Sequence, residues 1–336
     1  MKKKIFFSKK LDDISNIKKS FLKKNNYHLN EILRINKIYK KEKRRKYCKN
    51  CNFKLGKKSF NSFLIDYFIC PKCKHLNGGY EESKKFLKNI YSGNSGKNYA
   101  KNYLKEYKER LKNIYEPKAK FYKKVLGKCS FIELGSGNGS FLKACERYKI
   151  NGVGYETNKI MIELGKKNLK KNELFYCEME NLEKIIQTSN SECLVLIGVL
   201  EHLKNPNKII RSFKLSKCKY LYMSLPLFSL SSILENIFPK IYPRQLGGAH
   251  THLYTKKSLE FLIKKNQLKI LGEWWFGQDF LDLKRSILNS FDKKKLNSDF
   301  IKMYEELFGK YIDKFQNILD KNFVSSEVHM ILEKSK

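Results

Sequence analysis

The sequence Phe131-Ile-Glu-Leu-Gly-Ser-Gly-Asn-Gly139 predicts a buried β-strand that runs into a glycine-rich turn, with a helix beginning at about Ser140. Gly135 and Gly137 have no Cβ, so the backbone can bend sharply there and approach a ligand. The first turn of the helix offers unpaired N–H groups and a partial positive charge. Glu133 is unusual in such a loop, because its carboxylate would repel a pyrophosphate. It would attract an ammonium group, so the stretch predicts a pocket for a ligand that carries one.

Three more strands are predicted downstream, over Gly152–Glu156, Leu174–Cys177 and Cys193–Gly198. Glu156 lies about twenty residues past the glycine turn, where this kind of fold places an acid that accepts hydrogen bonds from a ribose. Taken singly, an acid at the end of a strand is more often just solvated. Several such positions in the same order and spacing favour one shared pocket.

The pattern Glu-x-Gly-x-Gly-x-Gly at 133–139 closely resembles the first motif of the class I S-adenosylmethionine-dependent methyltransferases, whose loop holds the methionine part of the cofactor. Val199-Leu-Glu-His-Leu-Lys-Asn-Pro206 is similar to a turn found in many small-molecule methyltransferases of that family. The resemblance covers about Leu126–Glu273 and implies S-adenosylmethionine as the cofactor. It places Glu178 at the adenine amine and Met179 beside the ring. The residues that we expect at the cofactor are Glu133, Gly135, Ser136, Gly137, Asn138, Gly139, Glu156, Thr157, Glu178, Met179, Gly198 and Tyr99.

Alternating strands and helices predict an α/β fold, with a mainly parallel sheet covered by helices on both faces. Later strands are expected at Tyr220–Pro226 and Leu268–Phe276, with Val324–Lys334 as the last, antiparallel strand. Thr255–Lys265 is typical of a capped amphipathic helix. The resemblance implies a Rossmann-like sheet of seven strands.

Cys48-Lys-Asn-Cys51 and Cys70-Pro-Lys-Cys73 precede this sheet. Two CxxC pairs at this separation predict a four-cysteine zinc ribbon with a structural metal, and Phe60–Ile69 would supply its strand pairing. The expected ligands are Cys48, Cys51, Cys70 and Cys73. A disulfide framework is disfavoured because no signal peptide is visible. His75 is expected at the surface.

A hydroxyl or carbon acceptor needs a base near the transferred carbon. His202 is the first candidate, since it follows the fourth strand and titrates in the useful range. Glu201 would orient it or bind the acceptor, although both residues could simply shape the loop. The second candidate is His250-Thr-His252, in a segment that resembles one near the acceptor in many relatives, and His252 matches that segment better than His250. A role for His252 in fixing the loop through a backbone carbonyl is equally open. Some relatives bind a divalent ion through Glu-x-x-Glu-His, but Gly198 occupies the first acid position.

The stretch Tyr80–Tyr122 is rich in tyrosine and predicted to be helical. In related methyltransferases such a helix lies over the cofactor as a lid. Tyr99, Tyr103 and Tyr107 recur at four-residue steps, which also fits the packed face of an amphipathic helix. We expect one of them, Tyr99, to contact the cofactor.

The domains expected are a lysine-rich helical lead-in at 1–46, the ribbon at 47–79, the lid at 80–124 and the methyltransferase domain at 125–336, with a helical insertion at 279–322. Tyr220–Phe238 is interrupted by proline and polar residues, so no membrane span is expected. With no targeting segment visible, we expect a cytoplasmic protein. The oligomeric state is left open.

The net charge of +37 suggests a nucleic-acid partner, but only eight of the 70 basic residues are arginines and the lysines are spread along the chain. The densest cluster, Lys40–Lys46, is interpreted as a solvated linker more readily than as an RNA-binding arm. Zinc modules precede this domain in sugar methyltransferases of surface-polysaccharide pathways and in some ribosomal RNA methyltransferases. We therefore expect a small-molecule acceptor, a sugar or nucleotide-linked sugar methylated on oxygen or carbon. An RNA methyltransferase is the alternative, and a non-catalytic adaptor a third.

Overall fold

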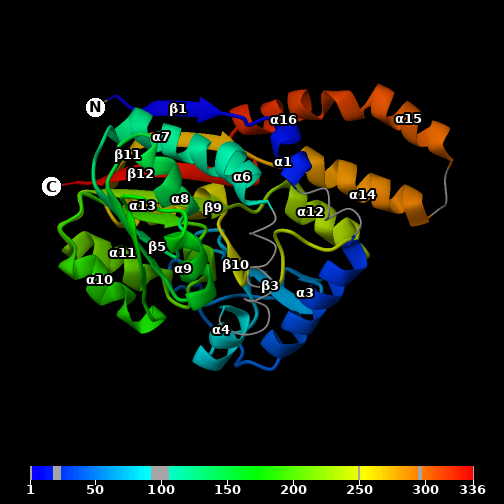
Figure 1. Cartoon of the computed structure of the whole chain (residues 1–336). Coiled ribbons are helices and arrows are strands. Elements are labelled where there is room, and N and C mark those ends of the chain that lie inside the picture. Colours follow the sequence, from blue (N-terminus) through cyan, green and yellow to red (C-terminus); the bar gives the residue numbers. More distant parts are fainter. Residues whose placement is uncertain (1, 18–23, 92–105, 249, 294–296, 336) are drawn as a thin grey trace.

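The computed structural model describes residues 2–17, 24–91, 106–248, 250–293 and 297–335. Its central sheet has eight strands in the order β1-β11-β12-β9-β8-β5-β6-β7 (Figure 1). Strand β12 is antiparallel to both of its neighbours, and the other pairs are parallel. The strands are β1 Lys4–Phe7, β5 Phe131–Leu134, β6 Gly152–Glu156, β7 Glu173–Tyr176, β8 Cys193–Ile197, β9 Tyr220–Pro226, β11 Leu268–Phe276 and β12 Glu327–Lys334. The mainly parallel sheet and the strands predicted in this part of the chain are thus confirmed.

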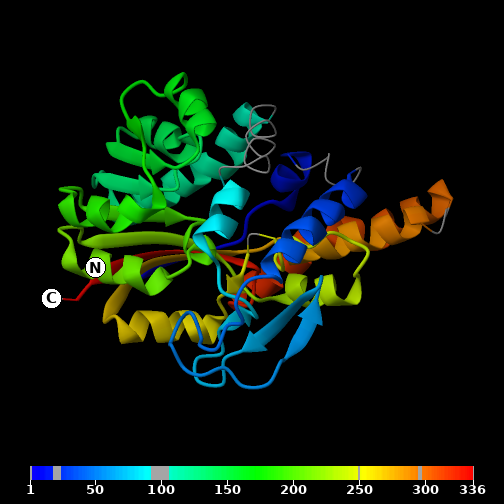
Figure 2. The ribbon, with the colours of Figure 1, turned by 90° about the horizontal axis from the view of Figure 1, so that it is seen from below.

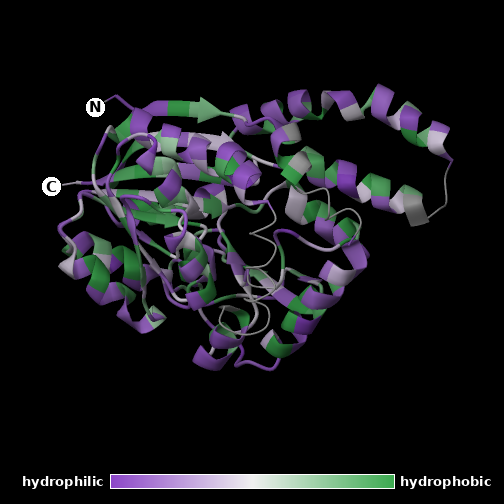
Figure 3. Ribbon diagram, in the orientation of Figure 1, coloured by the Kyte–Doolittle hydropathy of each residue, from purple (hydrophilic) through white to green (hydrophobic). Residues whose placement is uncertain are grey.

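Helices cover both faces of this sheet. They are α7 Glu116–Leu126, α8 Ser140–Glu146, α9 Lys159–Lys166, α10 Leu182–Thr188, α11 Pro206–Leu215 and α13 Lys256–Lys265. In β5, Phe131 packs into the cluster under α7 and α8, and Ile132 into the cluster under α10, α11 and α13. Because neighbouring strand residues face opposite sides, a strand buried on both faces reads as a continuous apolar run. Figure 3 shows these apolar strands inside a more polar outer layer.

The N-terminal lead-in differs from the helical expectation at its start. Lys4–Phe7 forms β1, which pairs in parallel with β11 and adds an eighth strand to the expected seven. Phe6 packs beside one core cluster and Phe7 beside the other. Four residues are too short to show a strand period, so this non-local pairing could not be read from the local pattern. The helices α1 Leu11–Ile17 and α3 Asn25–Tyr39 follow.

The ribbon forms a small second sheet that includes one strand from the methyltransferase part. It comprises β2 Phe60–Ser62, β3 Ile65–Ile69, β4 Leu76–Gly78 and β10 His252–Leu253, in the order β10-β4-β3-β2. The predicted pairing within 60–69 is confirmed. Because β10 directly precedes α13, the ribbon is joined to the main domain; in Figure 2 it lies at the bottom of the view, below the large sheet.

The predicted insertion between β11 and β12 is helical in its described part, with α14 Asp279–Lys293, α15 Ser298–Leu307, the 3₁₀ turn η4 Gly309–Tyr311 and α16 Ile312–Lys321. In Figure 1, α14 and α15 extend away from the sheet as an arm. The arm is fixed at its base, where α14 packs on α12 Leu230–Ile237 and Asp279 accepts a hydrogen bond from the Ser231 backbone N–H at 2.9 Å. Within the described ranges, no helix has the length and apolar character needed to cross a membrane.

Candidate active site

A cavity of about 500 Å³ opens at the carboxyl ends of β5, β6 and β8. Strand β5 lies between β6 and β8, so the crossovers leave it in opposite directions. In open α/β sheets, ligands bind at this switch point. Most of the predicted cofactor residues line the cavity, namely Glu133, Gly135, Ser136, Gly137, Glu156, Thr157, Met179 and Gly198.

The glycine turn adopts a backbone that favours glycine. Gly135, Gly137 and Gly139 have φ angles of 67°, 55° and 68°. A Cβ on Gly135 would lie 2.9 Å from Cγ2 of Val199, closer than real Cβ contacts come. Gly135 is therefore required both by the backbone conformation of the turn and by its close approach to the loop after β8.

Glu133 lies beneath this turn with one carboxylate oxygen unpaired. Its side chain is 3% exposed, and Oε2 has no hydrogen-bond partner among the described residues. Burial raises the pKa of Glu133 to about 8. A buried carboxyl group without a partner is costly, and a bound cation would relieve that cost. This orphaned oxygen fits the ammonium group of the expected cofactor.

Glu156, at the end of β6, fastens the loop. Its Oε2 accepts a hydrogen bond from the Gly137 N–H at 2.8 Å, and its Oε1 accepts from the backbone N–H groups of Thr157 and Asn158 at 2.7 and 2.9 Å. A carboxylate oxygen has two lone pairs, so Oε2 can accept a second bond, as binding of a ribose hydroxyl would require.

Four of the predicted cofactor residues are not among those lining this cavity. Asn138 is buried, and its Oδ1 accepts from Ser140 Oγ at 2.6 Å; Gly139 precedes α8 as its N-cap. Glu178 lies in the neighbouring hollow. Tyr99, like Tyr103, is outside the described residues, so its prediction stays untested. From the expected lid, the helix α4 Lys84–Tyr91 contributes Ile90, and the π-helical turn η1 Leu111–Tyr115, which follows α6 Tyr107–Arg110, contributes Tyr115.

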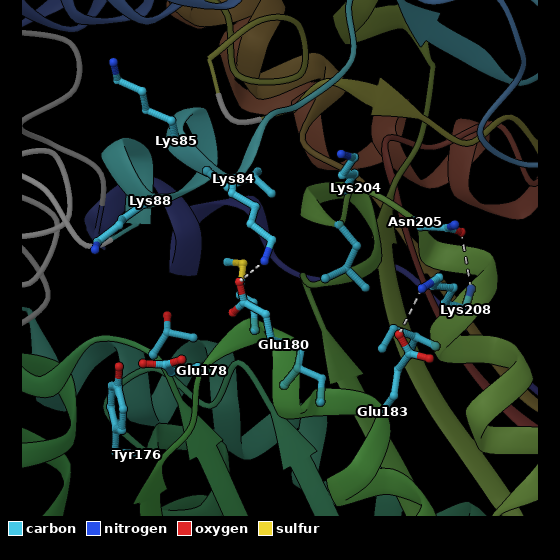
Figure 4. Close-up of a pocket in the computed structure, with 16 residues that line it drawn as sticks. Lys84, Lys85, Lys88, Tyr176, Glu178, Glu180, Glu183, Lys204, Asn205 and Lys208 are labelled. Atoms are coloured by element: carbon cyan, nitrogen blue, oxygen red, sulfur yellow. Dashed lines mark hydrogen bonds and ion pairs between the residues drawn. The ribbon is translucent and has the colours of Figure 1, made fainter.

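The neighbouring hollow, of about 780 Å³, carries a rim of lysines. It shares Thr157, Met179, Leu182 and Leu203 with the first cavity, so the two are continuous. Figure 4 shows Lys84 directed at Glu180 and Lys208 at Glu183, with N–O distances of 3.2 and 3.6 Å. The other lysines that line this hollow form no ion pair within the described chain; they are Lys85, Lys88 and Lys204.

The turn after β8 and the segment before β10 bring a carboxyl group and two imidazoles together. It is the 3₁₀ turn η3 Leu200–His202, and His202 lines the cavity. Glu201 is 2% exposed, with Oε1 at 3.9 Å from His202 Nε2, Oε2 unpaired in the described structure, and a pKa raised to about 8 by burial. His250 also lines the cavity, and its ring centroid lies 5.0 Å from that of His202. One donor atom from each residue falls within 4.8 Å of the others.

His250, the other histidine of the His250-Thr-His252 segment, faces the cavity. Its Nδ1 must donate to the Gln245 carbonyl at 3.1 Å, which leaves the lone pair on Nε2. Burial lowers the pKa of His250 to about 4, so the ring is neutral at pH 7. The sequence offered His250-Thr-His252 as a pair but could not tell which ring would face the cavity.

His252, the favoured member of that pair, lies elsewhere. It is fully buried, with Nε2 at 3.1 Å from the Leu200 carbonyl and Nδ1 at 2.9 Å from His75 Nε2. Both ring nitrogens are engaged, which corresponds to the loop-fixing role left open by the sequence. The expectation that His75 lies at the surface was wrong, because β10 pairs with the ribbon and covers it.

The four ribbon cysteines converge. Sγ of Cys48 lies 3.7 Å from that of Cys73, Sγ of Cys51 lies 3.4 Å from that of Cys70, and all four fall within 4.8 Å of one another. Zinc–sulfur bonds of about 2.3 Å in a tetrahedron place sulfurs about 3.8 Å apart. Asn77 Nδ2 also lies 3.6 Å from Cys48 Sγ, where it can donate to a thiolate. The donor set therefore fits a structural zinc ion.

Comparison with known proteins identifies the domain. A family model described as a methyltransferase domain matches residues 97–273. No curated protein matches the chain. Among solved structures, a SAM-dependent methyltransferase from Archaeoglobus fulgidus is 18% identical, with a TM-score of 0.42 over 69% of this chain and 100% of that one. Magnesium protoporphyrin IX methyltransferase from Synechocystis PCC 6803, solved with bound SAH, is 9% identical, with a TM-score of 0.49 over 75% and 100%. With TM-scores below 0.5, these similarities do not indicate an acceptor.

Proposed function

Because the chain belongs to the methyltransferase domain family and is an S-adenosylmethionine-dependent methyltransferase, we propose that its acceptor is a sugar or nucleotide-linked sugar of surface glycan synthesis, methylated on a hydroxyl or carbon. One observation carries the proposal. Two imidazoles, His202 and His250, line the same cavity as the glycine turn. A methyl transfer that also requires loss of a proton from the acceptor needs such groups beside the cofactor.

The chain's own residues have distinct tasks at the cofactor. Glu133 would pair with the ammonium group, and Oε2 of Glu156 would accept from a ribose hydroxyl. Met179 and Leu182, which line both hollows, would flank the adenine, with Glu178 near its amine. When bound, S-adenosylmethionine supplies a methyl carbon already activated by the positive sulfur. The remaining task of the protein is to align the acceptor and exclude water.

His202 remains our first candidate for the base, with His250 beside it. A proton taken from the acceptor hydroxyl would make one imidazole cationic. Glu201 Oε1 lies 3.9 Å from His202 Nε2. Once its own proton has passed to solvent, the Glu201 carboxylate would stabilise that cation. His202 and Glu201 together would therefore supply what an oxygen acceptor requires, an imidazole that accepts its proton and a carboxyl group that balances the resulting positive charge.

The lysine rim of the second hollow supports an acceptor that carries phosphate groups, as a nucleotide-linked sugar does. The same rim would suit RNA, which is the alternative. One observation weighs against a basic RNA-binding arm at 40–46. Arg44 and Arg45 form ion pairs with Asp66 and Glu82 inside the chain, and the Arg45 side chain is buried.

The four cysteines are proposed to hold one structural zinc ion, which elemental analysis of purified protein would detect. We also propose a cytoplasmic location, since all nine cysteines are free, as suits a reducing compartment.

The experiment is a transfer assay with labelled S-adenosylmethionine, a panel of nucleotide-linked sugars and, separately, ribosomal and transfer RNA. We expect methylation of one sugar class, lost in His202→Gln or His250→Gln and retained in the control His28→Gln, which alters a histidine on α3 away from the cavity. Methylated RNA, with binding that falls steeply as salt rises, would replace the sugar proposal with the alternative.

A further inference from the structure

The ribbon contacts the two segments that present the pocket imidazoles. Lys49, in the first cysteine knuckle, is buried, and its Nζ contacts three oxygens: Glu82 Oε1 at 2.7 Å, the Leu203 carbonyl at 2.7 Å and Thr251 Oγ1 at 3.4 Å. An ammonium group has three N–H donors, so all of them are used. Leu203 follows His202, and Thr251 follows His250. One side chain beside a predicted zinc ligand therefore bridges both segments.

A second chain of hydrogen bonds reaches the other end of the same turn. The Leu200 carbonyl can only accept, so His252 Nε2 is the donor of that 3.1 Å bond. His252 Nδ1 must then accept from His75 Nε2 at 2.9 Å. His75 lies two residues after Cys73. The carbonyls at both ends of the 200–203 turn are thus held by side chains that lead back to the ribbon.

Backbone contacts reinforce this link. Gly78 of β4 donates its N–H to the Thr251 carbonyl at 2.8 Å, and Asn207 Nδ2 donates to the Lys49 carbonyl at 2.6 Å. Lys49 N–H itself donates to Asn77 Oδ1 at 2.9 Å. The knuckle cannot move independently of the loops after β8 and before β10.

We propose that the ribbon is a positioning element for the active site, in which Lys49, together with His75 acting through His252, holds the segments that present His202 and His250. The proposal rests on the proposed role of these two imidazoles. It gives the ribbon an internal partner, the chain's own catalytic turn, in place of RNA. Lys49, His75 and His252 are positioning residues, since none of them lines the cavity.

The test uses the full-length zinc-loaded protein and three readouts. Lys49→Met keeps the length of the side chain but removes the ammonium group, and Glu82 keeps its partner Arg45 at 2.9 Å. The control is Lys54→Met, an exposed lysine of the same ribbon. The readouts are zinc content, the imidazole NMR signals of His202 and His250, assigned with His202→Gln and His250→Gln, and the affinity for S-adenosylhomocysteine.

We expect Lys49→Met to retain zinc, to shift both imidazole signals and to weaken S-adenosylhomocysteine binding about tenfold, the scale of one lost charge-assisted hydrogen bond. The Lys54→Met control should match the wild type. Unchanged imidazole signals in zinc-loaded Lys49→Met would overturn the proposal. If the wild type fails to bind S-adenosylhomocysteine, the proposed function fails, while the NMR comparison still decides the positioning role.

A second pair of variants tests the proposal even if Lys49→Met does not fold. His252→Ala removes the donor to the Leu200 carbonyl, whereas His252→Gln can restore it through its side-chain amide. We expect the His202 signal to move in His252→Ala and to return towards the wild-type position in His252→Gln. Equal signals in both variants and the wild type would contradict the role of His252.

Discussion

Replacing Glu133 with glutamine should stabilise the ligand-free protein and strongly weaken cofactor binding. Burial raises the pKa of Glu133 from 4.5 to about 8, so at pH 7 the folded protein retains a proton that the unfolded chain has lost. Between these pKa values the carboxyl group lowers folding stability progressively as pH rises. This titration lowers the free energy of unfolding by at most about 3 kcal/mol at pH 7 and by less than about 1 kcal/mol at pH 5. Glutamine does not titrate, so the variant should be more stable than the wild type, and its advantage should be larger at pH 7 than at pH 5.

The effect on binding has the opposite sign. The variant cannot pair with the ligand's ammonium group, and the loss of one partner from a buried ion pair costs about 3–5 kcal/mol. The affinity for S-adenosylhomocysteine should therefore fall at least about a hundredfold. Urea unfolding at pH 5 and pH 7.5 measures stability, and titration calorimetry measures binding. Glu163→Gln, on the exposed face of α9, is the matched control and should change neither. A Glu133→Gln protein that binds S-adenosylhomocysteine normally, or that loses stability equally at both pH values, would contradict a buried, ammonium-binding carboxyl group at this position.

Three further predictions concern the pocket and its supports. In the wild type, the affinity for S-adenosylhomocysteine should rise between pH 6 and pH 7.5, because binding lowers the raised pKa of Glu133 and releases its proton. Calorimetry in buffers of different ionisation enthalpy detects that proton. An affinity that does not change with pH would contradict the pairing of Glu133 with the ligand's amine. Gly135→Ala should weaken the same binding at least about tenfold, since the new Cβ meets Val199 at a positive φ, whereas Gly56→Ala, with open space around it, should be neutral in the same titration. Thr255→Ala should lower the free energy of unfolding by about 1 kcal/mol through loss of the capping box of α13, and an unchanged urea midpoint would count against that cap.

The methyltransferase core could be predicted from the sequence because its signals are local. The apolar run before Gly135 and the acid at Glu156 are fixed by strand burial and by the length of one strand–helix–strand unit. The same holds for the helix that begins after Thr255, where the cap precedes the apolar period. The structure places Gly135 and Glu156 around one cavity.

The rest depends on contacts between distant parts of the chain. Nothing near Lys4–Phe7 indicates that it pairs with β11, and nothing near His252 indicates that it pairs with the ribbon rather than facing the cavity. The contacts of Lys49 could not be predicted for the same reason, because its partners are Glu82, Leu203 and Thr251, far away in the sequence. Periodicity and spacing report local structure, and long-range pairing leaves little trace in either.

The most direct measurement is a crystal structure with S-adenosylhomocysteine bound. We predict that the ligand's amine lies within about 3 Å of the Glu133 carboxylate, the distance of a charge-assisted hydrogen bond, with the glycine turn against its amino-acid end. A ligand bound elsewhere, with the Glu133 carboxyl group still unpaired, would contradict it.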